Sequence, residues 1–150
     1  MIVVYDRPPL WDLIDKTFNV AGKPILFAWG NRIYNPEGAD VPKHLHAHEE
    51  LHGERQLACV GAQGEFEIEP GQSRFDPVEA WWRRYIRLPE FRLAEEIPAH
   101  RAEYLAICKR HADRNYRARA LSQIAMKLAA PLYGSLVTPA QARTLILESK

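Results

Sequence analysis

The feature that most constrains this chain is a histidine cluster between residues 44 and 52, where four of its six histidines lie in the segment HLHAHEELH. On an α-helix, residues four positions apart lie about 40° apart around the axis and about 6 Å apart along it. His48 and His52 have this spacing, so a helix would direct both imidazoles at one metal ion. We therefore predict a helix that begins near Pro42 and ends near Cys59.

Glu49 follows the first of these histidines and completes an H-E-x-x-H pattern. Near the same helix face, its carboxylate can accept a proton from a water molecule that a metal ion activates. The alternative interpretation is a polar, histidine-rich helix face without metal. His44 and His52 would lie about 12 Å apart along a straight helix, too far to share one ion. We expect His44 and His46 at the rim of the site or in solvent.

A zinc site of this kind needs a third ligand from a later segment, often a carboxylate, and leaves one position open for water. The candidates are Glu95, Glu96, His100 and Glu103, on a helix predicted from about 91 to 112 that contains Pro98. Residues 95 and 96 lie at the edge of its apolar face, where a carboxylate is a buried charge unless it is paired or binds metal. The alternative for each glutamate is an exposed helix acid beside a basic residue. If Glu96 is the ligand, we expect Glu95 on the surface.

The rest of the sequence predicts an α+β fold with a small N-terminal sheet and a helical majority. Strands are expected over 1–4, 25–28, 32–34 and, inside a loop rich in glycine and proline, 65–69. The second and third should form a hairpin across Gly30-Asn31. Further helices are expected over 10–18, 78–87, 115–129 and 139–148. A chain of 150 residues predicts one domain, residues 1–150.

Charge and hydropathy exclude several classes of partner. Twenty basic residues against 19 acidic ones leave a net charge of +1, so no general attraction to nucleic acid or anionic membranes is expected. The basic stretch 101–119 is expected to be a solvated helix face. No apolar run is long enough to span a membrane, and the N-terminus does not resemble a secretory signal. The two cysteines, Cys59 and Cys108, fit a reducing compartment.

Four segments carry a resemblance to a known family: ILFAWGNRIYN, HLHAHEELHGERQ, WWRRYIRLPEFRLAEEIPAHRAEY and LYGSLVTPAQA. Over residues 25–104, and more weakly to 146, the chain resembles the small HExxH zinc metallopeptidases with a glutamate third ligand, the minimal gluzincin type. It is similar to short uncharacterised proteins of that type from tailed bacteriophages and prophages. A protein of this kind would act in the cytoplasm of a bacterial host or in a virion.

The resemblance implies a zincin-like core, in which the edge strand of a short sheet borders the substrate cleft and two helices carry the site. The zinc ligands it implies are His48, His52 and Glu96, with Glu95 as the fallback for the third. Glu49 takes the position of the catalytic base. Pro98, only two residues beyond Glu96, departs from the family pattern.

The implied activity is hydrolysis of peptide bonds with zinc as cofactor and Glu49 as general base. Donors to the transition-state oxyanion could come from Tyr85, His100, Arg101 or Tyr104. The expected partner is a peptide or protein substrate, with other virion proteins or a second copy of the chain as further partners, but neither a membrane nor nucleic acid. The alternative function is a structural or assembly component of a phage virion whose zinc site is inert or structural.

Overall fold

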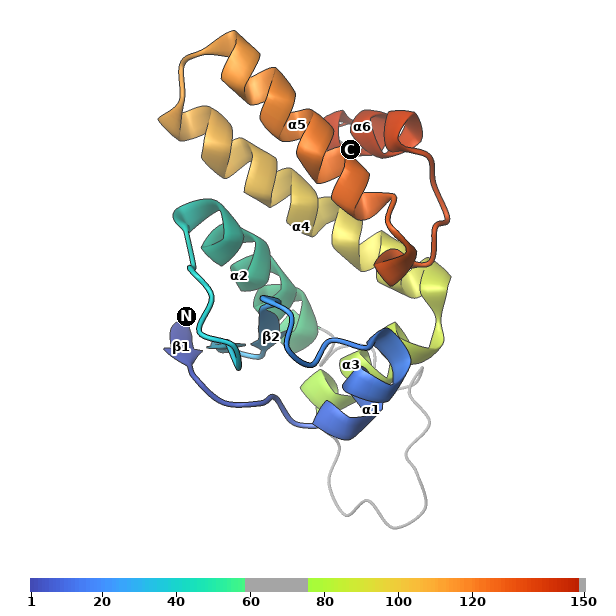
Figure 1. Ribbon diagram of the computed structural model, residues 1–150. Helices are drawn as coiled ribbons and strands as arrows, with labels where there is room; N and C mark the ends of the chain where they lie inside the picture. The colour runs from blue at the N-terminus through green and yellow to red at the C-terminus, as the bar shows by residue number, and fades with distance from the viewer. Residues whose placement is uncertain (59–75, 149–150) are drawn as a thin grey trace.

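The computed structural model describes residues 1–58 and 76–148 and confirms the predicted α+β class. In chain order, the elements are β1 (Ile2–Val4), α1 (Trp11–Phe18), β2 (Phe27–Trp29), β3 (Arg32–Tyr34), α2 (Lys43–Ala58), α3 (Pro77–Arg87), α4 (Pro89–Arg110), α5 (Arg114–Leu128), the 3₁₀ helix η2 (Pro131–Tyr133) and α6 (Pro139–Leu147). Figure 1 shows α4, α5 and α6 packed together at one end and the small sheet with α1 and α3 at the other. The strand predicted over 65–69 and Cys59 lie outside the described residues.

The sheet has three short strands in the order β1-β3-β2. β2 and β3 form the predicted antiparallel hairpin, with Trp29 opposite Arg32 and Gly30-Asn31 as the turn. Gly30 adopts a φ of 58°, the left-handed conformation that such a turn requires and that glycine tolerates. β1 adds to β3 in parallel, so β2 is left as an edge strand beside α2. Trp82 of α3 donates a hydrogen bond to the carbonyl of Ala28 on β2.

Local sequence signals fix where the helices begin. The side chain of Asp76 accepts hydrogen bonds from the backbone N–H groups of Val78 and Glu79 at the start of α3. Thr138 forms a capping box with Gln141 at the start of α6, whose first residue is a proline as predicted. α4 continues through Pro98 as one helix of 22 residues. Within the described residues, no helix is long and apolar enough to cross a membrane.

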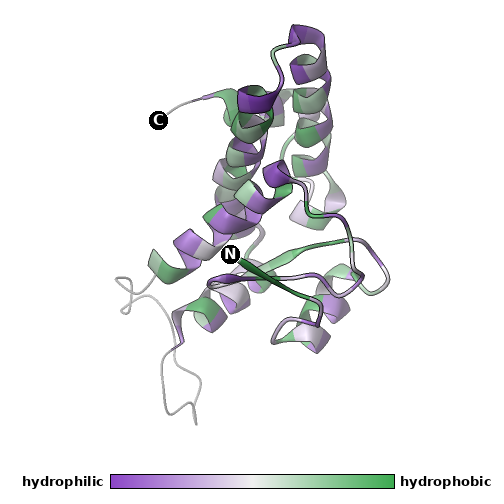
Figure 2. Cartoon of the chain, turned by 90° about the vertical axis from the view of Figure 1, so that its left-hand side faces the viewer, coloured by the Kyte–Doolittle hydropathy of each residue, from purple (hydrophilic) through white to green (hydrophobic). Residues whose placement is uncertain are grey.

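Two apolar clusters lie at opposite ends of the molecule. The first joins α1, β2 and α3 around Trp81 and Ile14. The second joins α4, α5 and α6 around Leu121 and Ile146. Figure 2 shows hydrophilic and hydrophobic residues interleaved along the helices, as expected where each helix buries only one stripe. Buried polar side chains of α2 and α4 lie between the clusters, and this polar layer contains the candidate site.

Candidate metal centre

Helix α2 carries the H-E-x-x-H residues and is held closely against the β2–β3 hairpin. Gln56, fully buried, accepts a hydrogen bond from the N–H of Gly30 at 2.7 Å and donates one to the carbonyl of Ala28 at 3.0 Å. One turn earlier, Gly53 packs so closely that an added Cβ would lie 2.2 Å from the Gly30 carbonyl oxygen. These contacts fix the rotation of α2 and direct His48 and His52 at α4.

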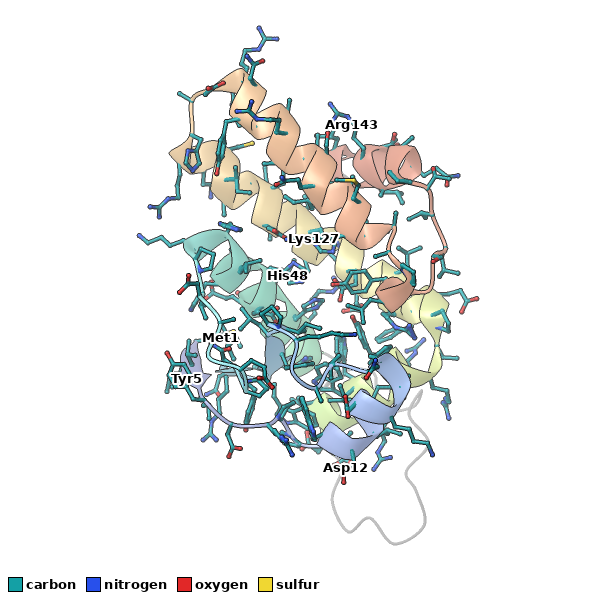
Figure 3. The ribbon with its side chains drawn as sticks, viewed as in Figure 1. Met1, Tyr5, Asp12, His48, Lys127 and Arg143 are labelled. Carbon is teal, nitrogen blue, oxygen red and sulfur yellow. The ribbon has the colours of Figure 1, made fainter. Side chains whose placement is uncertain are left out.

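Helix α4 brings Glu96 between the two histidines. Its Oε1 atom lies 3.2 Å from Nε2 of His52, and its Oε2 atom lies 3.5 Å from Nε2 of His48. All three side chains are at least nine-tenths buried. Figure 3 shows His48 between α2 and α4, where the two helices face each other. The structure thus brings together the three residues that the resemblance implies as zinc ligands.

His100 brings a further nitrogen to the same carboxylate. Its Nε2 atom lies 3.5 Å from Oε2 of Glu96, one helical turn earlier on α4. Donor atoms of His48, Glu96 and His100 all lie within 4.8 Å of one another, so these three residues could hold a metal ion. His100 is one of the alternatives predicted from the sequence for the third ligand, and the fold places it in the group together with Glu96.

Several buried polar atoms of these side chains have no hydrogen-bond partner in the described part of the chain, as expected if a metal ion binds between them. Within residues 1–58 and 76–148, four buried side-chain atoms of these residues have no hydrogen-bond partner: Nδ1 of His48, Nδ1 of His52, Oε2 of Glu96 and Nε2 of His100. Of these, Oε2 of Glu96 and Nε2 of His100 face each other at 3.5 Å. Buried polar atoms are normally satisfied, so such a concentration needs an explanation. Imidazole nitrogens with a carboxylate oxygen are the donor set that zinc takes in proteins. We conclude that the residues present could hold such an ion.

The electrostatics of the group favour positive charge at its centre. Burial opposes ionisation of Glu96, yet the neighbouring His52 and His48 hold the pKa of its carboxyl well below its usual range. Burial likewise opposes a charge on His48, but its contacts with Glu103 and Glu96 raise its pKa to about 10. The carboxylates therefore attract a cation, which can be a proton on His48 or a metal ion that displaces that proton.

Glu49 lies beside this group in a cavity. The cavity is lined by Ile14, Phe18, Val20, Ile25, Leu26, Phe27, Ala28, His48, Glu49, His52, Gln56, Trp81, Trp82, Tyr85, Glu96, Leu132 and Tyr133. Burial raises the pKa of Glu49, against the opposing effect of His48 and His52. A carboxylate with a raised pKa is a stronger proton acceptor. The cavity is thus lined by a possible general base, by residues that could hold a metal ion and by apolar side chains.

Glu95 faces away from the histidines and corrects the expectation of a surface position. Its side chain is buried and accepts two hydrogen bonds from Arg55 of α2, each 2.7 Å long. A third hydrogen bond, 3.0 Å long, comes from Nε1 of Trp81. Adjacent helix positions point about 100° apart, so Glu96 faces the histidines while Glu95 joins α4 to α2 and α3.

The candidate oxyanion donors are divided between two places. Tyr85 lies in the cavity and donates its hydroxyl proton in a short hydrogen bond to Oε1 of Glu96. Tyr104 instead packs against the α4–α5–α6 cluster, and Arg101 donates hydrogen bonds to the carbonyls at the end of α6. Neither of these two lines the cavity. Their contacts hold α4 against α6, and of these three candidates only Tyr85 is in the cavity.

Tyr133 is a cavity residue that sequence reasoning missed. It lies on η2, lines the cavity and packs its ring edge-on against His100, with centroids 5.6 Å apart. Burial and the negative charge of Glu96 raise its pKa well above the usual value, so its hydroxyl stays protonated. The segment LYGSL contains Tyr133, but no periodic pattern in the sequence indicates that a 3₁₀ turn there returns to α2 and α4.

The other two histidines of the 44–52 segment stay outside the group. His46 lies 3.9 Å from Glu50 on the partly exposed side of α2. His44 is also only partly buried, and burial is the largest cause of its lowered pKa. Both positions agree with the expectation that these histidines lie at the rim.

Comparison with known proteins gives no further assignment. No family model, curated protein or solved structure matched the chain.

Proposed function

We propose that this protein is a zinc-dependent peptidase with a zincin-like core, in which His48, His52 and Glu96 hold the ion and Glu49 is the general base. The observation that carries the proposal is the position of Glu96 within 3.5 Å of both H-E-x-x-H histidines, with Glu49 in the adjoining cavity. Two histidines, one carboxylate and a neighbouring acid are the set that metal-assisted peptide hydrolysis uses.

When bound, zinc would polarise the scissile carbonyl and make a water molecule more acidic. Glu49 would then take the proton of the attacking water on its carboxylate and later give it to the leaving amine. Tyr85 holds Glu96 through its hydroxyl, and this bond would keep the carboxylate oriented. Tyr133 has a protonated hydroxyl at the cavity wall and is the better placed candidate for an oxyanion donor.

The cavity wall indicates the class of substrate side chain. Most of its lining is aliphatic or aromatic, from α1, β2 and α3, including Ile14, Phe18 and Phe27. The carbonyl of Ala28 on the edge strand already accepts hydrogen bonds from Gln56 and Trp82. A peptide therefore cannot pair with that carbonyl, and we expect recognition to rest on an apolar side chain that enters the cavity.

A specific observation also favours a second candidate, a metal site with a structural role in a virion component. His100 offers a further nitrogen beside Glu96, and four protein donors would fill a tetrahedral zinc site. Structural zinc sites are closed in this way, whereas catalytic ones keep a position for water.

The two functions are separated by a cleavage assay. The full chain, loaded with one equivalent of zinc, is incubated with a peptide library whose members vary in one apolar position, and products are identified by mass spectrometry. A peptidase would cleave members with a large apolar residue, and a chelator or Glu49→Gln would abolish cleavage. Zinc binding without cleavage of any member would support the structural role, and cleavage by Glu49→Gln at the wild-type rate would contradict the assignment of the base.

A further inference from the structure

Glu103 lies behind the candidate metal group and contacts three cationic or polar side chains. Its Oε2 atom lies 3.1 Å from Nδ1 of His100 and 3.4 Å from Nδ1 of His48. Its Oε1 atom accepts a hydrogen bond from Nζ of Lys127 on α5 at 3.0 Å. Glu103 is only 1% exposed, and a buried carboxylate is costly unless it is paired. Lys127 supplies that pairing from a helix that contributes no donor to the group.

The hydrogen bond with Glu103 indicates which nitrogen of His100 carries a proton. For His48 the same inference rests on the 3.4 Å approach of Glu103 to Nδ1, an atom with no hydrogen-bond partner in the described residues. An ionised carboxylate can only accept hydrogen bonds, so a histidine that faces it must present an N–H. A neutral imidazole that is protonated at Nδ1 keeps its lone pair at Nε2. The Nε2 atoms of His48 and His100 both lie 3.5 Å from Oε2 of Glu96. Both lone pairs would therefore be directed at the same place.

We propose that Glu103, neutralised by Lys127, is the positioning residue of the metal site, because it holds His48 and His100 with Nδ1 protonated and Nε2 directed at the ion. The proposal rests on the proposed function for the ion itself. It also assigns His100 a lone pair rather than a proton at Nε2. His100 then has no N–H at Nε2 that could be donated to an oxyanion, the role considered for it from the sequence.

Other observations agree with this assignment. His100 Nδ1 makes a hydrogen bond of ordinary length with Glu103. The contact of His48 with Glu103 is longer, at 3.4 Å. Carboxylates that hold ligand histidines in this way commonly contribute 10–100-fold to metal affinity.

The test combines histidine tautomers with zinc affinity in the full-length chain. Long-range ¹H–¹⁵N spectra of the ¹⁵N-labelled protein report the protonated nitrogen of each imidazole. We expect His100 to be protonated at Nδ1 before zinc is added, and both His48 and His100 to be so afterwards. Competition with a chelator of known affinity measures zinc binding. Glu103→Gln should weaken it by about 10–100-fold, whereas Glu90→Gln, an exposed substitution on the same helix, should not.

Each outcome either supports or overturns the inference. Glu103→Gln with wild-type zinc affinity and unchanged tautomers would overturn it. If that variant fails to fold, substitutions of Lys127 provide the test. Lys127→Gln should lower zinc affinity, whereas Lys127→Arg should keep it near the wild-type value. Equal zinc affinity of these two variants would overturn the role of Lys127. A wild-type chain that binds no zinc would contradict the proposed function, and the tautomer of His100 before zinc addition would still test Glu103. Protonation of His100 at Nε2 would overturn the inference.

Discussion

The carboxylate of Glu96 lies 3.2 Å from Nε2 of His52, although the two residues belong to different helices. This distance relates two parts of the sequence that no local pattern connects. It brings the acid of α4 to the histidine pair of α2, and both residues are buried. Unless an ion or a proton balances it, such a buried carboxylate would be costly. The first three predictions follow from this arrangement.

Zinc should bind at a ratio of one per chain and stabilise the fold. A ligand that binds only the native state adds about 2.7 kcal/mol at a free concentration 100 times its Kd. Thermal unfolding of the zinc-loaded chain should therefore occur several degrees higher than after treatment with a strong chelator. Metal analysis after dialysis gives the ratio. Identical unfolding temperatures with and without zinc would contradict a native metal site.

Glu49→Gln should keep the metal and lose activity. Glu49 lines the cavity beside the histidines, where it can act on a water molecule rather than hold the ion. The amide has nearly the same shape and cannot take a proton, so cleavage of any substrate found for the wild type should fall by about 10²–10⁴-fold. Zinc titration checks the first half of the prediction. Loss of zinc in this variant would show that Glu49 is a ligand instead.

Substitutions at positions 95 and 96 should have opposite consequences. Glu96→Ala removes a ligand and should abolish tight zinc binding, a larger effect than the 10–100-fold typical of residues that only support a ligand. Glu95→Ala should leave zinc affinity nearly unchanged, because Glu95 bonds to Arg55 and Trp81 and not to the histidines.

The Glu95→Ala variant should nevertheless be less stable, by about 1–3 kcal/mol, because it leaves the buried Nε1–H of Trp81 without its acceptor. Chemical denaturation in the presence of a chelator measures this without a contribution from zinc. A variant at position 95 that unfolds like the wild type would contradict the interhelical role of Glu95.

Gly53→Ala should destabilise the protein. In an ordinary helix interior the same substitution would be favourable by about 1 kcal/mol, because alanine has the higher helix propensity. Here the new Cβ would lie 2.2 Å from the carbonyl oxygen of Gly30, which is backbone and cannot rotate away. Forced separation of α2 from the hairpin should cost about 1–3 kcal/mol. Denaturant unfolding of both chains shows the sign, and a more stable variant would contradict the close contact.

Much of the local structure follows from the sequence alone. The turn at Gly30-Asn31, the Thr138 cap and the helix predicted from near Pro42 all occur as expected, because each depends on residues close together in the chain. The helical spacing of His48 and His52 likewise needs no tertiary contact. These features are governed by backbone preferences and by side-chain hydrogen bonds over a few residues.

Residue patterns left four alternatives for the partner of this histidine pair, and only packing distinguishes them. The rotation of α4 against α2 puts Glu96 among the histidines and Glu95 against Arg55, although adjacent glutamates carry the same local signal. The same packing gives His100 and Glu103 their contacts and turns Tyr104 away. The sequence therefore determined the helices and the histidine pair, while the tertiary structure decided which acid meets that pair. The physical reason is that helix propensity depends on neighbours along the chain, whereas the orientation of a buried charge depends on the helices packed against it.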